Sequence, residues 1–450
     1  MSSESSLLTE PVPRLVLRLA IPASVGYFFN TLYNLIDTWF AGSLSTEALA
    51  ALGMSFPVFF VVIAVASGLS TGVSALLANA LGAGRHEEAR TLGTQAITFT
   101  LLASAVVTCG GALGAGPVFR ALGAAPEVAH LATRYMVIIF SGSVFFNVNH
   151  VMNACLVARG DTTTYRNVLI AGVGLNAILD PWFIYGGFGL PALGFDGIAL
   201  STVMIQAAAC GYLYRCARRR QAVAAFAPGN LRLSAEAAGA IFRQSGPAMI
   251  NMMTIGLGIL ILTYFVNEHG TAAVAAYGLA TRIEQLVLLP AIGLNLAVLA
   301  IVGQNNGAGR PDRIRETMRA ALRYGLYVLI PGFLLLVVWP DKSLALFTDD
   351  PDVQAIGVQY LRMAGFVLYA YVILFALTAA LQAIKQPMYA VWIGLYRQIV
   401  APVAIIYGLS RFAGLGIWSV WISIAFTTWS AALFTLWYAG KRLRSTAHPS

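Results

Sequence analysis

Residues 18–42 read RLAIPASVGYFFNTLYNLIDTWFAG, an apolar run that carries a carboxylate near its end. At about 1.5 Å per residue, a helix of this length crosses the hydrocarbon core of a bilayer. Asn30, Asn34 and Asp37 follow one another at spacings of four and three residues, so they share a helical face. An isolated carboxylate near hydrocarbon costs at least ~2.5 kcal/mol. Asp37 is therefore expected to face protein or a water-filled cavity, unless it reaches water at the helix end beside Gly42.

The composition of the whole chain is that of a polytopic membrane protein. Its 450 residues are 58% hydrophobic and only 10% charged, and the mean hydropathy is +0.74. Soluble domains carry about 25% charged residues. The four cysteines lack the spacing of zinc ligands and indicate no disulfide framework. The opening MSSESSLLTEPVPR lacks the features of a signal peptide, so we expect the first span to direct insertion.

Apolar windows predict an all-α protein with twelve transmembrane helices. The chain is expected to divide into an N-lobe of residues 1–217 and a C-lobe of residues 239–450, joined by a cytoplasmic linker of residues 218–238. The expected spans cover residues 14–41, 51–81, 91–115, 130–157, 166–187, 196–216, 240–267, 272–303, 318–339, 354–383, 389–409 and 414–439.

Lysine and arginine are distributed unequally between the two sides that these spans define. Twenty-two of the 28, Arg397 among them, fall on one side, five fall on the other, and Arg282 lies inside a span. By the positive-inside rule, both termini are expected in the cytoplasm and the protein in the cytoplasmic (inner) membrane. The net charge of +9 then reflects topology and contact with anionic membrane lipid, so nucleic acid is not an expected partner.

The sequence repeats itself at an offset of 225 residues. Pro22 aligns with Pro247, and GAGR at 82–85 aligns with GAGR at 307–310. Each half holds six spans, an even number, so the two six-helix lobes are expected to be related by a pseudo-two-fold axis along the membrane normal. Parallel repeats of this kind form two-lobed transporters with a site at or near the lobe interface.

Three acidic residues lie well inside the predicted spans, and two of them fall at similar depth in the N-lobe. Asp180 follows Asn176 by one helical turn, so the amide and the carboxylate share a face. The topology places Asp37, Asp180 and Thr202 level with one another. Their oxygens suit Na⁺, and two neighbouring carboxylates can equally carry a proton. The alternative is that Asp180 only ends a helix and Asn176 bonds a neighbour. The third acid, Glu284, lies in the C-lobe.

Other polar residues and one proline have open roles. Asn149 and Asn153 share a face of the fourth predicted span and could extend the N-lobe network. Pro22 could bend the first span or simply occupy its first turn. In the C-lobe, Arg282 precedes Glu284 by two residues, and residues two apart do not share a helical face. Contact with substrate and structural pairing are both open for these two C-lobe candidates.

These motifs together resemble the multidrug and toxic compound extrusion (MATE) family of secondary transporters over about residues 14–440. The resemblance implies alternating access between two lobes, with export of cationic or amphiphilic drugs in exchange for H⁺ or Na⁺. It implies no enzymatic activity and no cofactor apart from the coupling ion, and we expect a monomer. The motifs that carry it are YNLIDTWFAG, GVSALLANALGAGR, ARGDTT, GLNAILDPWFIYG, LGFDGIALSTV and, in the second half, YGLATRIEQLVLLPAIGLNLAVLAIVGQNNGAGRPDR.

The resemblance also assigns expected roles to individual residues. Some family members hold the coupling ion on the first, fifth and sixth helices, at the positions that match Asp37, Asn176, Asp180 and Thr202 here, where Na⁺ could bind. The first helix of these relatives bends at the residue that matches Pro22 when the carboxylates are protonated or occupied. A supporting polar network, or contact with substrate, is expected from Asn30, Tyr33, Asn34, Asn149 and Asn153.

The second half departs from one branch of that family. That branch carries a glutamate on the seventh helix and an aspartate on the tenth, whereas MINMMT and LYAYVILF supply neither here. The chain therefore resembles the DinF-like branch more closely. A lipid-linked precursor flippase of the same superfamily is the first alternative. Such a protein needs a cationic cavity, and the scarcity of intramembrane Arg and Lys argues against it, Arg282 being the one clear candidate. An intramembrane enzyme is a weaker alternative, because the sequence shows neither a nucleophile–His–acid set nor HExxH.

Overall fold

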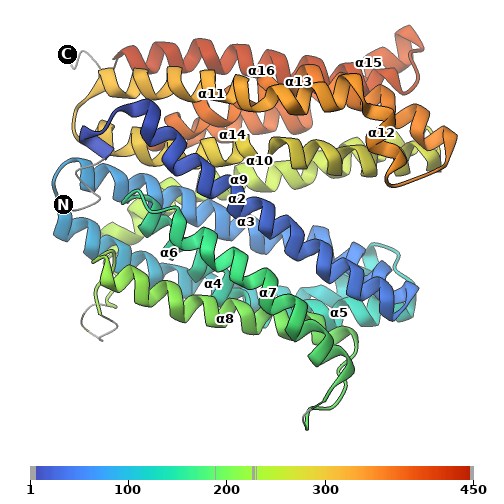
Figure 1. Cartoon of the computed structure of the whole chain (residues 1–450), viewed down its shortest axis with the longest axis horizontal. Coiled ribbons are helices and arrows are strands. Elements are labelled where there is room, and N and C mark those ends of the chain that lie inside the picture. Colours follow the sequence, from blue (N-terminus) through green and yellow to red (C-terminus); the bar gives the residue numbers. More distant parts are fainter. Residues whose placement is uncertain (1–6, 188, 226–228, 230, 446–450) are drawn as a thin grey trace. The chain divides into compact units, whose positions relative to one another are not determined.

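The described residues of the computed structural model, 7–187, 189–225, 229 and 231–445, are almost entirely helical (Figure 1). The helices of the first half are α2 (Val12–Leu44), α3 (Thr46–Gly82), α4 (His86–Ala121), α5 (Pro126–Ser141), α6 (Ser143–Val157), α7 (Thr163–Tyr185) and α8 (Phe195–Arg219). Those of the second half are α9 (Ala235–Asn267), α10 (Thr271–Gly307), α11 (Pro311–Val338), α12 (Pro340–Ala345), α13 (Pro351–Ala383), α14 (Met388–Leu395), η1 (Tyr396–Val400), α15 (Ala401–Gly408), η2 (Leu409–Ala413) and α16 (Trp418–Ser445).

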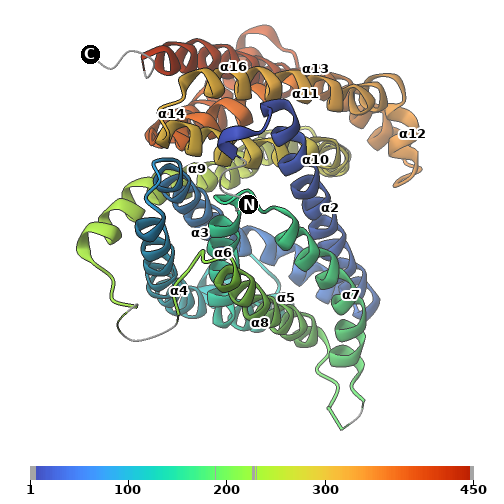
Figure 2. The same ribbon diagram turned by 60° about the vertical axis from the view of Figure 1, so that its left-hand side comes forward.

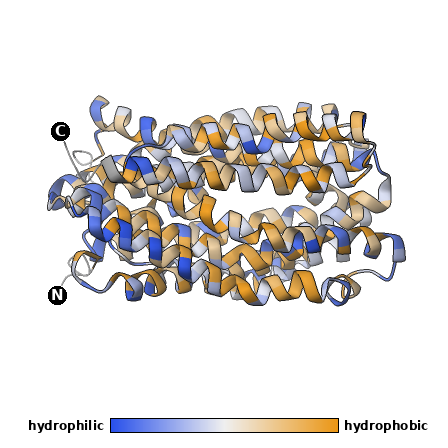
Figure 3. Ribbon diagram, turned by 90° about the horizontal axis from the view of Figure 1, so that it is seen from above, coloured by the Kyte–Doolittle hydropathy of each residue, from blue (hydrophilic) through white to orange (hydrophobic). Residues whose placement is uncertain are grey.

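The number of membrane spans agrees with the sequence prediction. Among the described residues, eleven helical segments are long and apolar enough to cross a bilayer, and the bent pair α5–α6 brings the number to twelve. Hydrophobic residues occupy the middle of the helices, and hydrophilic residues gather towards their ends (Figure 3). The predicted all-α polytopic fold with twelve spans is therefore confirmed.

The described chain forms two compact units whose boundaries lie inside helices. One unit holds residues 25–249, and the other holds residues 1–24 and 250–450. The first boundary follows Pro22 in α2 by two residues, and the second follows Pro247 in α9 by two residues. The boundaries thus keep the 225-residue offset of the repeat. The predicted division at residues 218–238 stays a prediction, and residues 226–228 and 230 of that linker lie outside the described residues.

The unit of residues 25–249 packs around small residues on α3. A side chain at Gly72 would place its Cβ 2.6 Å from the backbone nitrogen of Ser245, and one at Gly68 would come equally close to that of Met249. These two glycines therefore let the first part of α9 approach α3 closely, as small residues do between membrane helices. In the same unit, α7 and α8 form a helical hairpin (Figure 2) that carries most of the predicted ion-site residues.

The other unit has the same kind of glycine contact, here between α10 and the first part of α2. Gly293 of α10, the counterpart of Gly68, packs against Ala20 and Ser24 of α2, and a Cβ there would lie 2.6 Å from the Ala20 carbonyl oxygen. Ser24 is itself the counterpart of Met249. The same glycine contact thus holds the proline-bearing helix in each unit.

The GAGR motif of each half forms the turn that ends its second helix. Gly84 and Gly309 have φ of 75° and 64°, a region that favours glycine because other residues meet steric strain there. In the two turns, the Arg85 and Arg310 amides donate to the carbonyls five residues earlier, at 2.9 and 2.8 Å. This is the pattern that commonly closes α-helices, so the repeated motif is explained by backbone geometry.

Candidate functional site

Asp37 lies in the second part of α2, inside the unit of residues 25–249, and is 5% exposed. The Asn176 amide on α7 donates a hydrogen bond of 2.9 Å to Asp37 Oδ1. Asn176 is itself fully buried. The sequence placed Asp37 level with Asp180, which lies one turn beyond Asn176, and the structure brings the Asp37 and Asn176 side chains together.

Asp180 lies one turn beyond Asn176 on α7, is fully buried, and joins the same group. Its carboxyl group interacts electrostatically with the carboxyl group of Asp37. The Ser201 hydroxyl on α8 also hydrogen-bonds Asp180. Three helices therefore meet at two carboxyl groups.

Ser201 is a member of this group that the sequence analysis did not identify. Thr202, the next residue, is the one that the sequence predicted for the site. Its hydroxyl instead accepts a 3.1 Å hydrogen bond from the Tyr33 hydroxyl of α2. Adjacent helical residues differ by about 100° in direction, so only one of the pair can face Asp180. The sequence shows two neighbouring hydroxyl residues in LSTV, but it does not show which of the two faces Asp180.

Two oxygens of the group have no hydrogen-bond partner among the described residues: Asn176 Oδ1 and Asp180 Oδ2. A buried polar atom without a partner is costly, and two ionised carboxylates in contact repel one another strongly in a low-dielectric interior. A proton or a cation between the carboxyl groups removes both problems. Hard oxygen donors of this kind suit a small hard cation, so the residues fit either coupling ion.

The remaining N-lobe candidates are not part of this contact group. Asn30 and Asn34 are exposed on α2, where the Asn34 amide donates 2.9 Å to the Asn30 carbonyl. On α6, Asn149 donates to the Gln206 side chain on α8 at 2.8 Å. Asn153 is buried, and its Oδ1 has no hydrogen-bond partner among the described residues. A role in substrate contact stays a prediction for these residues.

Pro22 lies inside α2, just before the helix passes from one unit to the other. A proline removes the backbone hydrogen bond to the carbonyl four residues earlier, which weakens the helix locally. The structure therefore places Pro22 in the helix interior, where a bend is physically reasonable. Its role as a hinge stays a prediction.

A second buried acid, Glu284 on α10, lies in the other unit. It is 6% exposed and accepts a 2.5 Å hydrogen bond from the Tyr360 hydroxyl on α13. Tyr277 and Trp421 pack edge-on against the Tyr360 ring, with centroids 5.4 and 5.0 Å away. Glu284 thus sits in an aromatic environment with a strong hydrogen-bond donor.

The arginine that interacts electrostatically with Glu284 is not the one next to it in sequence. Arg282 is exposed on α10 whereas Glu284 is buried, so the two do not share a helical face, as the two-residue spacing predicted. Arg397, which the sequence analysis counted with the arginine-rich side, lies within the span of Met388–Ala413, on the π-helical turn η1. Its guanidinium lies 5.4 Å from the centre of the Tyr371 ring and interacts electrostatically with Glu284.

Comparison with known proteins agrees with this arrangement. Residues 22–182 and 247–407 each match the MatE family, and the two matched stretches are 225 residues apart, at the offset of the repeat. The chain belongs to the MatE family. MATE proteins are membrane transporters coupled to ion gradients, so this chain is a multi-pass membrane transporter of small molecules and not an enzyme. Assignment to the DinF-like branch stays a prediction.

Individual relatives cover nearly the whole MATE chain. An FAD transporter of Shewanella oneidensis is 29% identical over 409 residues, which are 89% of this chain and 88% of that protein. A probable multidrug resistance protein NorM of Thermotoga maritima is 25% identical over 421 residues, 92% and 90% of the two chains. A solved MOP superfamily transporter from Pyrococcus furiosus superposes with a TM-score of 0.92 at 25% identity, covering 99% of this chain and 98% of that one.

Proposed function

We propose that this MATE protein is a secondary active antiporter that exports organic cations or amphiphilic drugs in exchange for H⁺ or Na⁺. The observation that carries the proposal is the buried group of Asp37, Asn176 and Asp180, in which Asn176 Oδ1 and Asp180 Oδ2 have no hydrogen-bond partner among the described residues. The coupling ion is the group that such an arrangement lacks. The transporter acts as a monomer in the cytoplasmic membrane, with both termini in the cytoplasm; residues 1–6 and 446–450 lie outside the described residues.

Ion binding acts on α2 through Asp37. Asn176 and Asp180 lie on α7 and Ser201 lies on α8, so an ion between the carboxyl groups draws residues 25–44 of α2 towards these two helices. Without the ion, repulsion between the carboxylates loosens that packing. Pro22 supplies the point about which this part of α2 bends. Ion and drug must favour different states, because tight binding alone shifts no equilibrium.

Transport in proteoliposomes tests the proposal. The purified protein is reconstituted, and movement of ethidium, a fluorescent organic cation, is followed under a pH gradient alone and under a Na⁺ gradient alone. The proposal expects one of the two gradients to drive ethidium against its own gradient, and the responding gradient identifies the ion. Failure of both gradients in vesicles that contain folded protein contradicts antiport.

A second candidate substrate is a flavin dinucleotide. The observation in its favour is the similarity of this chain to the FAD transporter of Shewanella oneidensis. Arg282, exposed within α10, offers a cation for a phosphate group. Uptake of FAD into the same vesicles distinguishes the two classes: drug export alone leaves FAD outside. Movement of a lipid-linked pyrophosphate and not of ethidium would instead favour the flippase alternative.

A further inference from the structure

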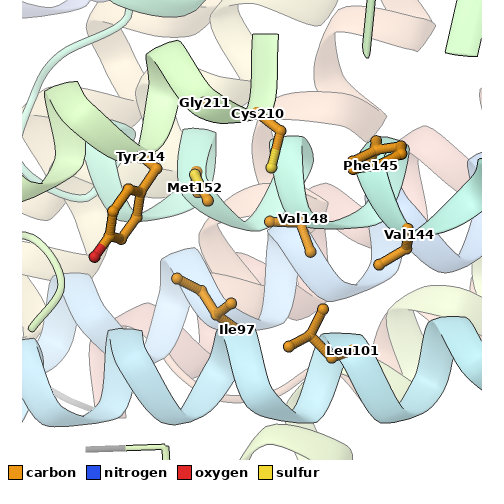
Figure 4. A pocket seen from close by; sticks show the side chains of 9 residues that line it. All are labelled: Ile97, Leu101, Val144, Phe145, Val148, Met152, Cys210, Gly211 and Tyr214. Atoms are coloured by element: carbon orange, nitrogen blue, oxygen red, sulfur yellow. The ribbon is translucent and has the colours of Figure 1, made fainter. Parts of the chain in front are cut away.

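An apolar groove lies between α4, α6 and α8, and neither Asp37 nor Asp180 lines it (Figure 4). Its volume is about 340 Å³, and all of its lining residues belong to the unit of residues 25–249. The residues that define its floor, rim and ends are Ile97, Leu101, Phe145, Met152, Gly211 and Tyr214.

The groove has a buried floor and an open rim. Ile97 and Met152 in the floor are at most 1% exposed, whereas Leu101 on the rim is 37% exposed. Gly211 on α8 is exposed, and an added Cβ would meet nothing within 4 Å. Because α4 and α8 are membrane spans, an open apolar rim on them faces hydrocarbon. The groove is therefore a place for an apolar chain from the membrane.

The dimensions of the groove match one leaflet of a bilayer. It extends along α6 from Val144 to Met152, eight residues, which corresponds to about 12 Å at the helical rise. One leaflet contributes about 15 Å of hydrocarbon. A single acyl chain lying along the helices fills this length.

Arginines from two of the helices gather at one end of the groove, beyond Tyr214. On α8, Arg215 and Arg218 follow Gly211 and Tyr214 by one turn each, so they continue the groove face. Arg215 is exposed and forms no ion pair among the described residues. Arg218 donates at 3.4 Å to the Val223 carbonyl, which leaves its charge without a carboxylate.

The α4 helix adds a third arginine at this end. Arg90 precedes Ile97 by seven residues, two helical turns, and therefore lies on the same face. Its ion-pair partner, Glu87, is 3.6 Å away and has a side chain 85% exposed, so solvent weakens the pair. The apolar lining of the groove suits an acyl chain, and the three arginines at its end suit the anionic headgroup of the same phospholipid.

We propose that this groove is a binding site for one anionic phospholipid. An acyl chain lies along α6 between Leu101 and Gly211, and the phosphate contacts Arg215 and Arg218, with Arg90 nearby. The Tyr214 ring lies at the boundary between chain and headgroup, the depth at which tyrosine is enriched in membrane proteins. The site is separate from ion coupling and does not depend on the proposed direction of transport.

Native mass spectrometry of the purified full-length protein tests the site. The protein is delipidated in mild detergent and titrated with phosphatidylglycerol or phosphatidylcholine of the same chain length. The wild type is expected to bind one phosphatidylglycerol more tightly than the others and to prefer it over phosphatidylcholine. Each charge removal, Arg215→Gln or Arg218→Gln, should lower this preference roughly fivefold, because one arginine near anionic lipid contributes about 1 kcal/mol. Arg319→Gln, at an exposed arginine of α11, is the matched control and should change nothing.

The acyl-chain contact is tested by filling the groove. Gly211→Leu places a side chain in the open space and should remove the tight site for both lipids. Gly110→Leu on α4, at another exposed helical glycine with nothing within 4 Å of its Cβ, should leave lipid binding intact. The proposal is overturned if the wild type shows no preference for phosphatidylglycerol, or if the two arginine variants keep that preference. Should Gly211→Leu fail to fold, the arginine variants still decide the matter.

Discussion

The two buried acid groups of this MATE protein differ in how their oxygens are hydrogen-bonded. In the unit of residues 25–249, Asp37 and Asp180 both belong to the group around Asn176, and two oxygens of this group have no hydrogen-bond partner among the described residues. In the other unit, Glu284 receives the Tyr360 hydroxyl and has the Arg397 charge nearby. The first group has two buried oxygens that an added cation can contact, whereas the Glu284 carboxylate of the second already accepts a hydrogen bond from Tyr360. An acid whose carboxylate already has a close hydrogen-bond donor is a poorer site for a coupling ion.

The repeat makes this difference more informative, because the surrounding frame is the same in both halves. Gly68 and Gly293 hold matching helices, and the two GAGR turns have the same hydrogen bonds. At the 225-residue offset, however, Leu262 stands in place of Asp37, and Phe59 stands in place of Glu284. The glycine contacts and the GAGR turns therefore occur in both halves, whereas each acid occurs in only one. The two halves share a helical framework and differ in the few residues that give each its acidic site.

The largest expected effect is the loss of ion-driven transport in Asp180→Asn or Asp37→Asn. Removing one of two interacting buried charges weakens ion binding by roughly a hundredfold, while the amide preserves the shape of the side chain. The measurement is the initial rate of ethidium transport in proteoliposomes at equal protein content. Glu284→Gln neutralises an equally buried acid and should keep ion-driven transport. Loss of coupling in Glu284→Gln with normal coupling in Asp180→Asn would reverse the assignment.

The next effect concerns stability and the second group. Tyr360→Phe removes the donor at 2.5 Å from Glu284 and should destabilise the protein by about 1–3 kcal/mol, because a buried acceptor is left unpaired. Thermal unfolding in detergent measures this loss. Tyr264→Phe removes a hydroxyl from an exposed tyrosine and serves as the control. A stability equal to that of the wild type would show that Glu284 does not depend on Tyr360.

Ser201→Ala should have a smaller effect, confined to the ion group. Asp180 loses the Ser201 hydroxyl, and one hydrogen bond of this kind corresponds to roughly a three- to tenfold change in ion affinity. The ion concentration that gives half-maximal transport should rise, with the maximal rate nearly unchanged. An unchanged half-maximal concentration would remove Ser201 from the site. Thr202→Val, which removes the acceptor for Tyr33, is the neighbouring comparison.

The smallest expected effect separates the two prolines. Pro22→Ala restores a backbone hydrogen bond just before the part of α2 that carries Asp37, and should slow ion-driven turnover severalfold. Pro247→Ala makes the same change in α9, where the matching segment carries no acid, and should slow it less. Both substitutions should shift stability by no more than about 1 kcal/mol. Equal slowing in the two variants would mean that bending at Pro22 has no special link to the ion.

The spans and the repeat could be predicted because both depend on features that are periodic along the chain. The bend of 46° between α5 and α6 was not predicted. Gly142, at the bend, lies against Val203 of α8, where a Cβ would collide, and such a tertiary contact cannot be seen in the sequence. The position of a residue along its predicted span shows how deep it lies in the membrane. This depth was sufficient to predict that Asp37 and Asp180 belong to one group.

Direction around a helix was harder to predict than depth. Ser201 was missed in favour of Thr202, although both lie at the same level of α8. Arg397 was counted with the arginine-rich side, because nothing local to its sequence shows that Glu284 lies nearby. Contacts between distant helices decide such cases, and a hydropathy pattern does not contain them.

Ion binding by the purified protein tests the central claim most directly. The coupling ion identified by transport, either ²²Na⁺ or protons counted by release into weak buffer, is titrated against the wild type, Asp37→Asn, Asp180→Asn and Glu284→Gln. The account predicts that either aspartate substitution weakens ion binding roughly a hundredfold, and that Glu284→Gln leaves the affinity of the acid pair for the ion as it is in the wild type. Wild-type binding in both aspartate variants would contradict the claim that this acid pair holds the coupling ion.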